Sequence, residues 1–191
     1  DILHSYEKIR TEIYDQSTTA SEVIADTIID AINACQGRKF KLGLSTGVSP
    51  ISLYKWLTRK YDEGKVSFSN VEVYSIDEYY PYGKGEPQSR NSILHSSLLN
   101  AVDIKEENIH IPDGSIPEDK ISSYCEEYDK MARDLDMLVI GMGEAGQVGF
   151  NEAGSTPASR TRTVLLSYQS RKRQGKNFNG DFKHTPSEAI T

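Results

Sequence analysis

The sequence has little cysteine, no long apolar segment and no excess of positive charge. Its two cysteines, Cys35 and Cys125, form no CxxC pair, so neither a disulfide framework nor a thiolate metal site is indicated. No run approaches the ~18 apolar residues of a transmembrane helix, and the first residues lack the pattern of a signal peptide. We therefore expect a cytoplasmic protein that has no contact with a membrane.

The charge balance is acidic, with a formal net charge of −6 from 22 basic and 28 acidic residues. Proteins that bind nucleic acid usually present a basic surface, so we expect no nucleic-acid partner. A small anionic ligand remains compatible, because two or three local cations can bind one. The four histidines are scattered without metal-ligand spacing, and we expect neither a metal nor a cofactor.

Short apolar runs and amphipathic segments alternate along the 191 residues, a length that suits a single domain. We predict strands at residues 40–44, 71–76, 108–111, 135–140 and 163–166, with the run at 135–140 the most buried. We predict helices that begin near Thr19, Pro50 and Pro117, and one through residues 93–99. The alternation indicates an α/β fold, a three-layer sandwich with a mainly parallel, Rossmann-like sheet and helices on both faces.

Details of these elements follow from spacing and turn chemistry. Thr19 and Glu22 have the spacing of a capping box, and Val23, Ile24 and Ile28 open the apolar stripe of that first helix. The helix after Pro117 has its stripe at Ile121, Tyr124, Cys125, Tyr128 and Met131. Residues 12–14 are compatible with a short strand.

Three polar or glycine-rich loops follow predicted strands, at residues 45–49, 77–80 and 141–152. Ligands bind at the carboxyl ends of strands in such folds, so these loops are the predicted site. Residues 141–146 spell GxGxxG, the dinucleotide fingerprint, which requires a helix to open at that loop. The glycines, asparagine and proline of residues 149–157 make a helix there improbable, which argues against an oxidoreductase that uses this loop.

Several segments together resemble the glucosamine-6-phosphate deaminases, and related 6-phosphogluconolactonases match less well. The resemblance runs in order from about residue 11 to the last residue. The segments that carry it are LGLSTG at 42–47 with Ser49 and Pro50, VSF at 66–68, IDEY at 76–79, GMG at 141–143 with Gly146, GFNE at 149–152 and SRTR at 159–162.

The resemblance implies conversion of an amino-sugar phosphate to a ketose phosphate and ammonia. In that family a carboxylate at the position of Asp77 moves a proton between C2 and C1, and the glutamate at Glu152 takes part in ring opening. Phosphate and substrate binding are implied for the positions of Ser45, Thr46, Gly47, Ser49, Gly143 and Lys176.

The chain departs from the family at the ring-opening group. The family's histidine corresponds to Gln147 and its aspartate to Ala145, and glutamine cannot exchange a proton near neutral pH. Val48 stands where a second glycine is usual, and Lys176 where an arginine is usual. Three hypotheses follow: an isomerase or deaminase with a changed ring-opening group, for which Gln147 remains a candidate catalytic residue; a phosphosugar-binding paralogue without turnover; and the dinucleotide-dependent oxidoreductase.

Each assignment has a simpler alternative. Asp77 and Glu78 could be a solvated strand end, Glu152 a loop carboxylate, Thr46 and Ser49 turn and cap residues, and Gln147 a polar loop residue. The resemblance also implies a further strand–helix–strand portion with a phosphate-binding lysine after Thr191, so we expect the domain in residues 1–191 to be C-terminally truncated. Its ligand would be a small phosphosugar, and the resemblance allows a homo-oligomer.

Overall fold

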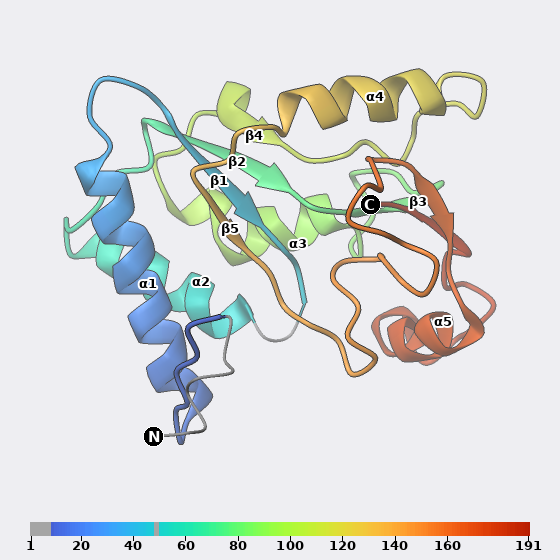
Figure 1. The fold of residues 1–191 in the computed structure, drawn as a ribbon, viewed down its shortest axis with the longest axis horizontal. Helices are drawn as coiled ribbons and strands as arrows, with labels where there is room; N and C mark the ends of the chain where they lie inside the picture. Colours follow the sequence, from blue (N-terminus) through green and yellow to red (C-terminus); the bar gives the residue numbers. More distant parts are fainter. Residues whose placement is uncertain (1–8, 48–49) are drawn as a thin grey trace.

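A parallel four-stranded sheet forms the centre of the computed structural model, which describes residues 9–47 and 50–191 (Figure 1). Its strands are β1 (Phe40–Leu44), β2 (Val71–Ser75), β4 (Ile109–His110) and β5 (Met137–Val139). They lie in the order β4-β2-β1-β5, and all neighbouring pairs are parallel. The predicted strands at 40–44 and 71–76 are confirmed to within one residue, whereas those at 108–111 and 135–140 are shorter than predicted.

Helices cover both faces of this sheet, as Figure 1 shows. One face carries α1 (Ser17–Ala34), α2 (Pro50–Asp62) and α3 (Arg90–Ser97), and the other carries α4 (Ile121–Met131). The right-handedness of β-α-β crossovers explains this division. The chain moves from β1 through α2 to β2, and through α3 to β4, toward one edge of the sheet, which places α2 and α3 on the same face. It then moves in the opposite direction from β4 through α4 to β5, which places α4 on the other face. The predicted three-layer α/β fold is confirmed.

The main apolar core lies between the sheet and the first three helices. Alternate residues of β1 and β2 point into it, including Leu42 and Val73, and Ile28, Leu57 and Leu94 meet them from the helices. On the opposite face, the hydroxyl of Tyr128 in α4 donates to the carbonyl oxygens of Ser75 (2.8 Å) and His110 (3.0 Å). No helix within residues 9–47 or 50–191 is long and apolar enough to cross a membrane.

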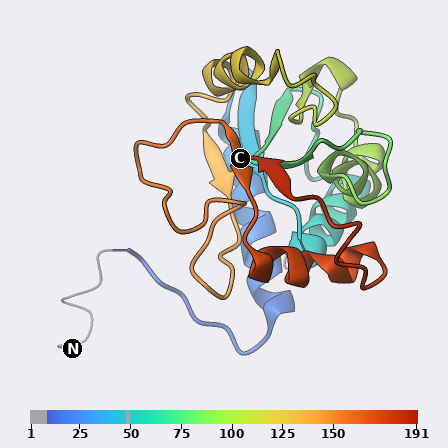
Figure 2. The same ribbon diagram turned by 90° about the vertical axis from the view of Figure 1, so that its right-hand side faces the viewer.

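A second sheet lies beside the carboxyl ends of the parallel strands. It consists of β3 (Glu78–Tyr80), β6 (Thr163–Leu165) and β7 (Glu188–Ile190), paired antiparallel in the order β3-β7-β6. The sequence predicts only β6, which is rich in β-branched and apolar residues, whereas β3 and β7 are equally short and show no alternating pattern to mark them as strands. Next to this sheet lie α5 (Tyr168–Gln174) and the 3₁₀ segment Gly175–Phe178, while Thr191 lies near the centre of the molecule (Figure 2).

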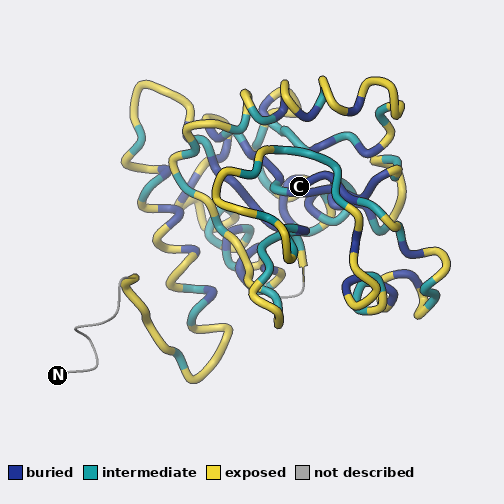
Figure 3. The backbone as a smooth tube through the Cα atoms, turned by 45° about the vertical axis from the view of Figure 1, so that its right-hand side comes forward, coloured by how far each residue is buried: buried dark blue, intermediate teal, exposed yellow. Residues whose placement is uncertain are grey.

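Burial corrects some of the predicted faces (Figure 3). The strand β5 is not the most buried one: Leu138 is 47% exposed, because among the described strands β5 pairs only with β1 and forms an edge. In α1, Val23 and Ile24 are exposed, and Met131 is exposed at the end of α4. Periodicity located these helices and most of their buried faces, since Ile28 of α1 and Ile121, Cys125 and Tyr128 of α4 are buried as predicted.

Helix and strand ends also differ from the predictions. Helix α1 begins at Ser17 after Gln16, without a side-chain cap, so Thr19 does not start it. Helix α4 begins at Ile121 rather than at Pro117, and residues 12–14 form no strand. Two shorter 3₁₀ segments lie at Leu99–Ala101 and Glu106–Asn108. None of these differences moves the carboxyl ends of the parallel strands, where the predicted site lies.

Candidate active site at the strand ends

The parallel register brings the ends of three strands together. Leu44 of β1 pairs with Ser75 of β2 and with Val139 of β5, so the residues that follow each strand are neighbours. The backbone N–H of Ile76 also donates to the carbonyl of Leu44 at 3.2 Å. The three loops selected from the sequence therefore begin at one edge of the sheet.

The loop after β1 presents two buried hydroxyls. The Oγ of Ser45 and the Oγ1 of Thr46 have no hydrogen-bond partner among the described residues. Gly47 has a φ of +145°, a conformation that side-chain-bearing residues rarely adopt. Ser49 and Val48 lie outside the described residues. An unpartnered buried hydroxyl costs about 1–3 kcal/mol, so this pair is a candidate for contacts to a ligand.

Asp77, directly after β2, is buried with only 4% of its surface exposed. Its Oδ1 lies 3.3 Å from Nε of Arg90 in an ion pair. Burial raises the pKa of Asp77, and the Arg90 guanidinium opposes that shift. The alternative that Asp77 is part of a solvated strand end is wrong.

Glu78 is fully buried beside it, a property that the sequence did not reveal. Its Oε1 accepts from the backbone N–H groups of Tyr79 (2.8 Å) and Arg90 (2.9 Å), and Oε2 from that of Asn91 (3.0 Å). Burial raises the pKa of Glu78 to about 7, although these donors favour the ionised form. Glu78 thus holds the first turn of α3 against the strand end.

The loop after β5 is a compact turn rather than a helix. The N–H of Gly143 donates to the carbonyl of Gln147 (2.8 Å), and Met142 and Val148 form a β-bridge. Residues 148–155 contain no helix. The glycine motif at residues 141–146 therefore lacks the helix that dinucleotide binding requires, as the sequence predicts. A Cβ on Gly143 would lie 2.2 Å from the side-chain amide nitrogen of Gln147, so a larger residue there would force the Gln147 side chain to move.

Gln147 is engaged within its own loop. Its Oε1 accepts from the N–H of Ala145 at 3.0 Å. The two positions for which the resemblance implies a departure from the deaminase pattern are therefore in direct contact. The structure assigns Gln147 a loop-stabilising hydrogen bond, and a catalytic role for it stays a prediction.

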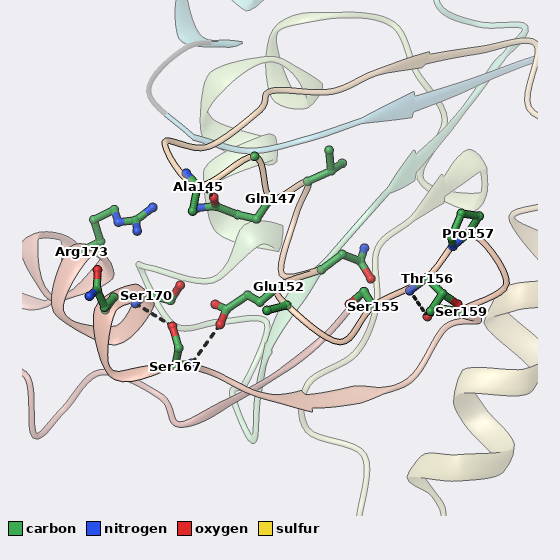
Figure 4. Close-up of a pocket in the computed structure, with 15 residues that line it drawn as sticks. Ala145, Gln147, Glu152, Ser155, Thr156, Pro157, Ser159, Ser167, Ser170 and Arg173 are labelled. Atoms are coloured by element: carbon green, nitrogen blue, oxygen red, sulfur yellow. Dashed lines mark hydrogen bonds between the residues drawn. The ribbon is translucent and has the colours of Figure 1, made fainter.

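A cavity of about 800 Å³ opens between this loop and α5 (Figure 4). Glu152 lies on its wall: Oε2 accepts from the N–H of Ser167 (3.1 Å), and the buried Oε1 has no partner among the described residues. Arg173 also lines the cavity and brings a positively charged guanidinium to its wall. The other lining residues are Ala145, Gly146, Gln147, Val148, Asn151, Ala153, Ser155, Thr156, Pro157, Ser159, Ser167, Gln169 and Ser170.

The cavity contains only part of the predicted site. Glu152 and Gln147 line it, whereas Ser45, Thr46, Gly143 and Asp77 do not. Lys176 is exposed on the Gly175–Phe178 segment and does not line the cavity either. Within the described residues no three His, Cys, Asp or Glu side chains come together as a metal site would require.

Gly149 connects Asp77 to the loop that carries Glu152. A Cβ on Gly149 would lie 3.2 Å from Oδ2 of Asp77 and 3.1 Å from Oγ1 of Thr191, and its φ is +58°. The N–H of Phe150 donates to the same Thr191 hydroxyl at 3.2 Å. The loop backbone therefore lies directly against the Asp77 carboxylate.

We expect Gly149→Ala to destabilise the protein by roughly 1–3 kcal/mol, because the new methyl group adds a steric contact to an unfavourable φ. Gly146→Ala is the matched control, since Gly146 has a φ of +77° with nothing within 4 Å of a Cβ. Urea unfolding of both variants measures the difference. Equal losses of stability would contradict the close contact at Gly149.

Comparison with known proteins agrees with this architecture. The family model for glucosamine-6-phosphate isomerases and 6-phosphogluconolactonase matches residues 15–174. A glucosamine-6-phosphate deaminase-like protein of Bacteroides thetaiotaomicron is 37% identical over 195 residues, which cover 100% of this chain and 29% of that protein. The chain thus spans less than a third of that relative.

Solved structures show the same fold. A monomeric glucosamine-6-phosphate deaminase superposes with a TM-score of 0.90 at 26% identity, over 96% of this chain and 75% of that one. The 6-phosphogluconolactonase of Thermotoga maritima has a TM-score of 0.67 at 20% identity, over 90% and 72% of the two chains. The chain belongs to the family of glucosamine-6-phosphate isomerases and 6-phosphogluconolactonases.

Proposed function

We propose that this protein binds an amino-sugar phosphate and acts on it as an isomerase or deaminase of carbohydrate metabolism. The reaction would convert a hexosamine 6-phosphate and water to a ketose 6-phosphate and ammonia. One observation carries the proposal. Of the six buried side-chain atoms without a hydrogen-bond partner among the described residues, three belong to the predicted site residues Ser45, Thr46 and Glu152. A fourth is Oδ1 of Asp77, whose contact is the ion pair with Nε of Arg90 at 3.3 Å.

Their chemistry suits the substrate. The hydroxyls of Ser45 and Thr46 can donate to a phosphate, with Gly47 and Ser49 in the same loop. Asp77 would act as the base that moves a proton between C2 and C1, next to a carbonyl or iminium. Glu152 would assist ring opening, with its free Oε1 facing the sugar. Arg173 or Lys176 would add positive charge for the phosphate.

A second candidate is a phosphosugar-binding protein without turnover. The hydrogen bond between Gln147 and Ala145 favours it, because the side chain that replaces the family's histidine is held by its own loop and cannot exchange protons. Such a protein would bind the same sugar phosphates and release neither ammonia nor ketose.

A thermal-shift screen across hexosamine and hexose phosphates tests binding. A ligand at about 100 times its Kd should add about 2.7 kcal/mol of stability. Glucosamine without phosphate and inorganic phosphate alone are the controls, and each should give a smaller shift. A folded protein that responds to none of the sugar phosphates would contradict both candidates.

Ammonia and ketose release from the best binder then separates the two candidates. We expect both products in equal amounts, because one hydrolysis yields one molecule of each. Clear binding without either product would instead identify the phosphosugar-binding protein.

A further inference from the structure

Arg90 is a buried arginine at the centre of the strand-end site. It is the first residue of α3 and is only 5% exposed. Its guanidinium lies 4.6 Å from the ring centroid of Tyr79 and 5.1 Å from that of Phe150. Arginine is rarely buried without a partner, and here the partner is Asp77 at 3.3 Å. No motif in the sequence singles out this residue.

Two carboxylates that are adjacent in the sequence bind Arg90, one at its side chain and one at its backbone. Asp77 contacts the guanidinium, and Glu78 accepts a hydrogen bond from the Arg90 backbone N–H at 2.9 Å. The N-cap Ser89 accepts from the N–H of Ser92, which fixes the start of α3. The position of the guanidinium is therefore set by the same strand end that carries the proposed base.

The other side of the guanidinium faces the loop after β5. Phe150 belongs to that loop and lies two residues before Glu152. Its ring also contacts that of Tyr79, with centroids 5.4 Å apart. One cation thus touches the Asp77 carboxylate and the segment that leads to Glu152, although these come from different parts of the chain.

We propose that Arg90 is a positioning residue for the isomerisation step: it keeps the Asp77 carboxylate ionised and aligned with residues 149–152. The inference rests on the proposed function of Asp77. Arg90 acts through that carboxylate rather than by touching the substrate. A base must be unprotonated before it can accept the C2 proton, and a buried carboxylate stays so only with a compensating charge.

The remaining titratable groups that face Asp77 supply no such charge. They are Tyr79 of β3, Tyr54 of α2 and Tyr128 of α4, and Glu78, the next residue along the chain, is itself an acid. Burial raises the pKa of each tyrosine, so these three stay neutral near pH 7. Among the described residues, Arg90 is the cation within ion-pair distance of Asp77.

Arg90→Met and Arg90→Lys test the inference through pH–rate profiles and an NMR titration of the ¹³C-labelled Asp77 carboxyl. Without the cation, Asp77 holds its proton to higher pH. We expect Arg90→Met to raise two values by about 1–3 pH units: the pH at which the rate falls on the acid side of the pH–rate profile, and the midpoint of the Asp77 carboxyl titration. We also expect a lower kcat with little change in KM. Arg90→Lys should restore most of both.

Arg59→Met is the matched control. The Arg59 guanidinium also lies over an aromatic ring, that of Trp56 at 5.1 Å, and forms an ion pair with a carboxylate, that of Glu63 at 3.0 Å. Unlike Arg90, Arg59 is exposed. Arg59→Met should shift neither the profile nor the titration. An unshifted Asp77 titration in Arg90→Met would overturn the inference, whether or not the enzyme turns over. A wild-type protein without turnover would contradict the proposed function instead, and the titration would still test Arg90.

If Arg90→Met does not fold, the double variant Asp77→Asn with Arg90→Met is measured. Restored folding would support the pairing, since both buried charges are then gone. A double variant that stays unfolded would overturn it.

Discussion

Asp77→Asn is expected to lower the rate of isomerisation by about 10²–10⁴-fold, the usual contribution of a positioned general base, equivalent to roughly 3–5 kcal/mol of barrier. The amide has nearly the shape of the carboxylate but cannot accept the C2 proton. Steady-state kinetics of ketose release measure the effect. Binding of the sugar phosphate, followed by thermal shift, should change much less than kcat.

The control for this substitution is Asp119→Asn, an exposed aspartate outside the site, which should leave kcat unchanged. Because Asp77 pairs with Arg90, Asp77→Asn also removes one half of a buried ion pair, so circular dichroism must first establish that the variant is folded. Undiminished turnover in a folded Asp77→Asn protein would contradict the assigned role.

Introducing the ring-opening pair that the resemblance implies at these positions, Gln147→His with Ala145→Asp, is expected to raise the proposed deamination by about 10²–10⁴-fold, because histidine exchanges protons near neutral pH and glutamine does not. The two positions are already in contact through the Ala145 N–H and the Gln147 Oε1 at 3.0 Å. An aspartate at 145 would lie on the same turn as the histidine, and we expect its carboxylate to orient the imidazole. Ammonia release from glucosamine 6-phosphate is the measurement.

Each single variant is the control for this pair. Gln147→His alone should gain less, because nothing then orients the imidazole, and Ala145→Asp alone should gain nothing. A double variant that binds the ligand but releases no more ammonia than the original protein would show that loss of this pair does not limit the reaction.

Local pattern predicted the main sheet and most of its helices. The runs at β1 and β2 are short, apolar and bounded by turn residues, so their limits are visible without tertiary information. The second sheet could not be predicted in this way. Its strands β3 and β7 pair with each other, with Glu78 opposite Ile190, but neither strand has a periodic pattern of its own. Such pairing depends on where the rest of the chain places the two segments.

The site divides in the same way. The pattern of strands located the three loops, and the family resemblance singled out Ser45, Thr46, Asp77 and Glu152 within them. Buried atoms of Ser45, Thr46 and Glu152 have no hydrogen-bond partner among the described residues, and Asp77 is buried in an ion pair with Arg90. Glu78 and Arg90 were not recognised, because their significance lies in burial and in contacts between β3 and α3. The place of Arg173 on the cavity wall depends on how α5 packs beside the loop after β5.

The sequence by itself determined the fold class and the three strand-end loops, because residue types, their order and their local periodicity are sufficient for these. Only the tertiary structure decided that Asp77 and Glu78 are buried, that Arg90 lies between two rings beside Asp77, and that Gln147 bonds to its own loop. Burial and charge pairing depend on which distant segments pack together, and that information does not lie in any one stretch of sequence.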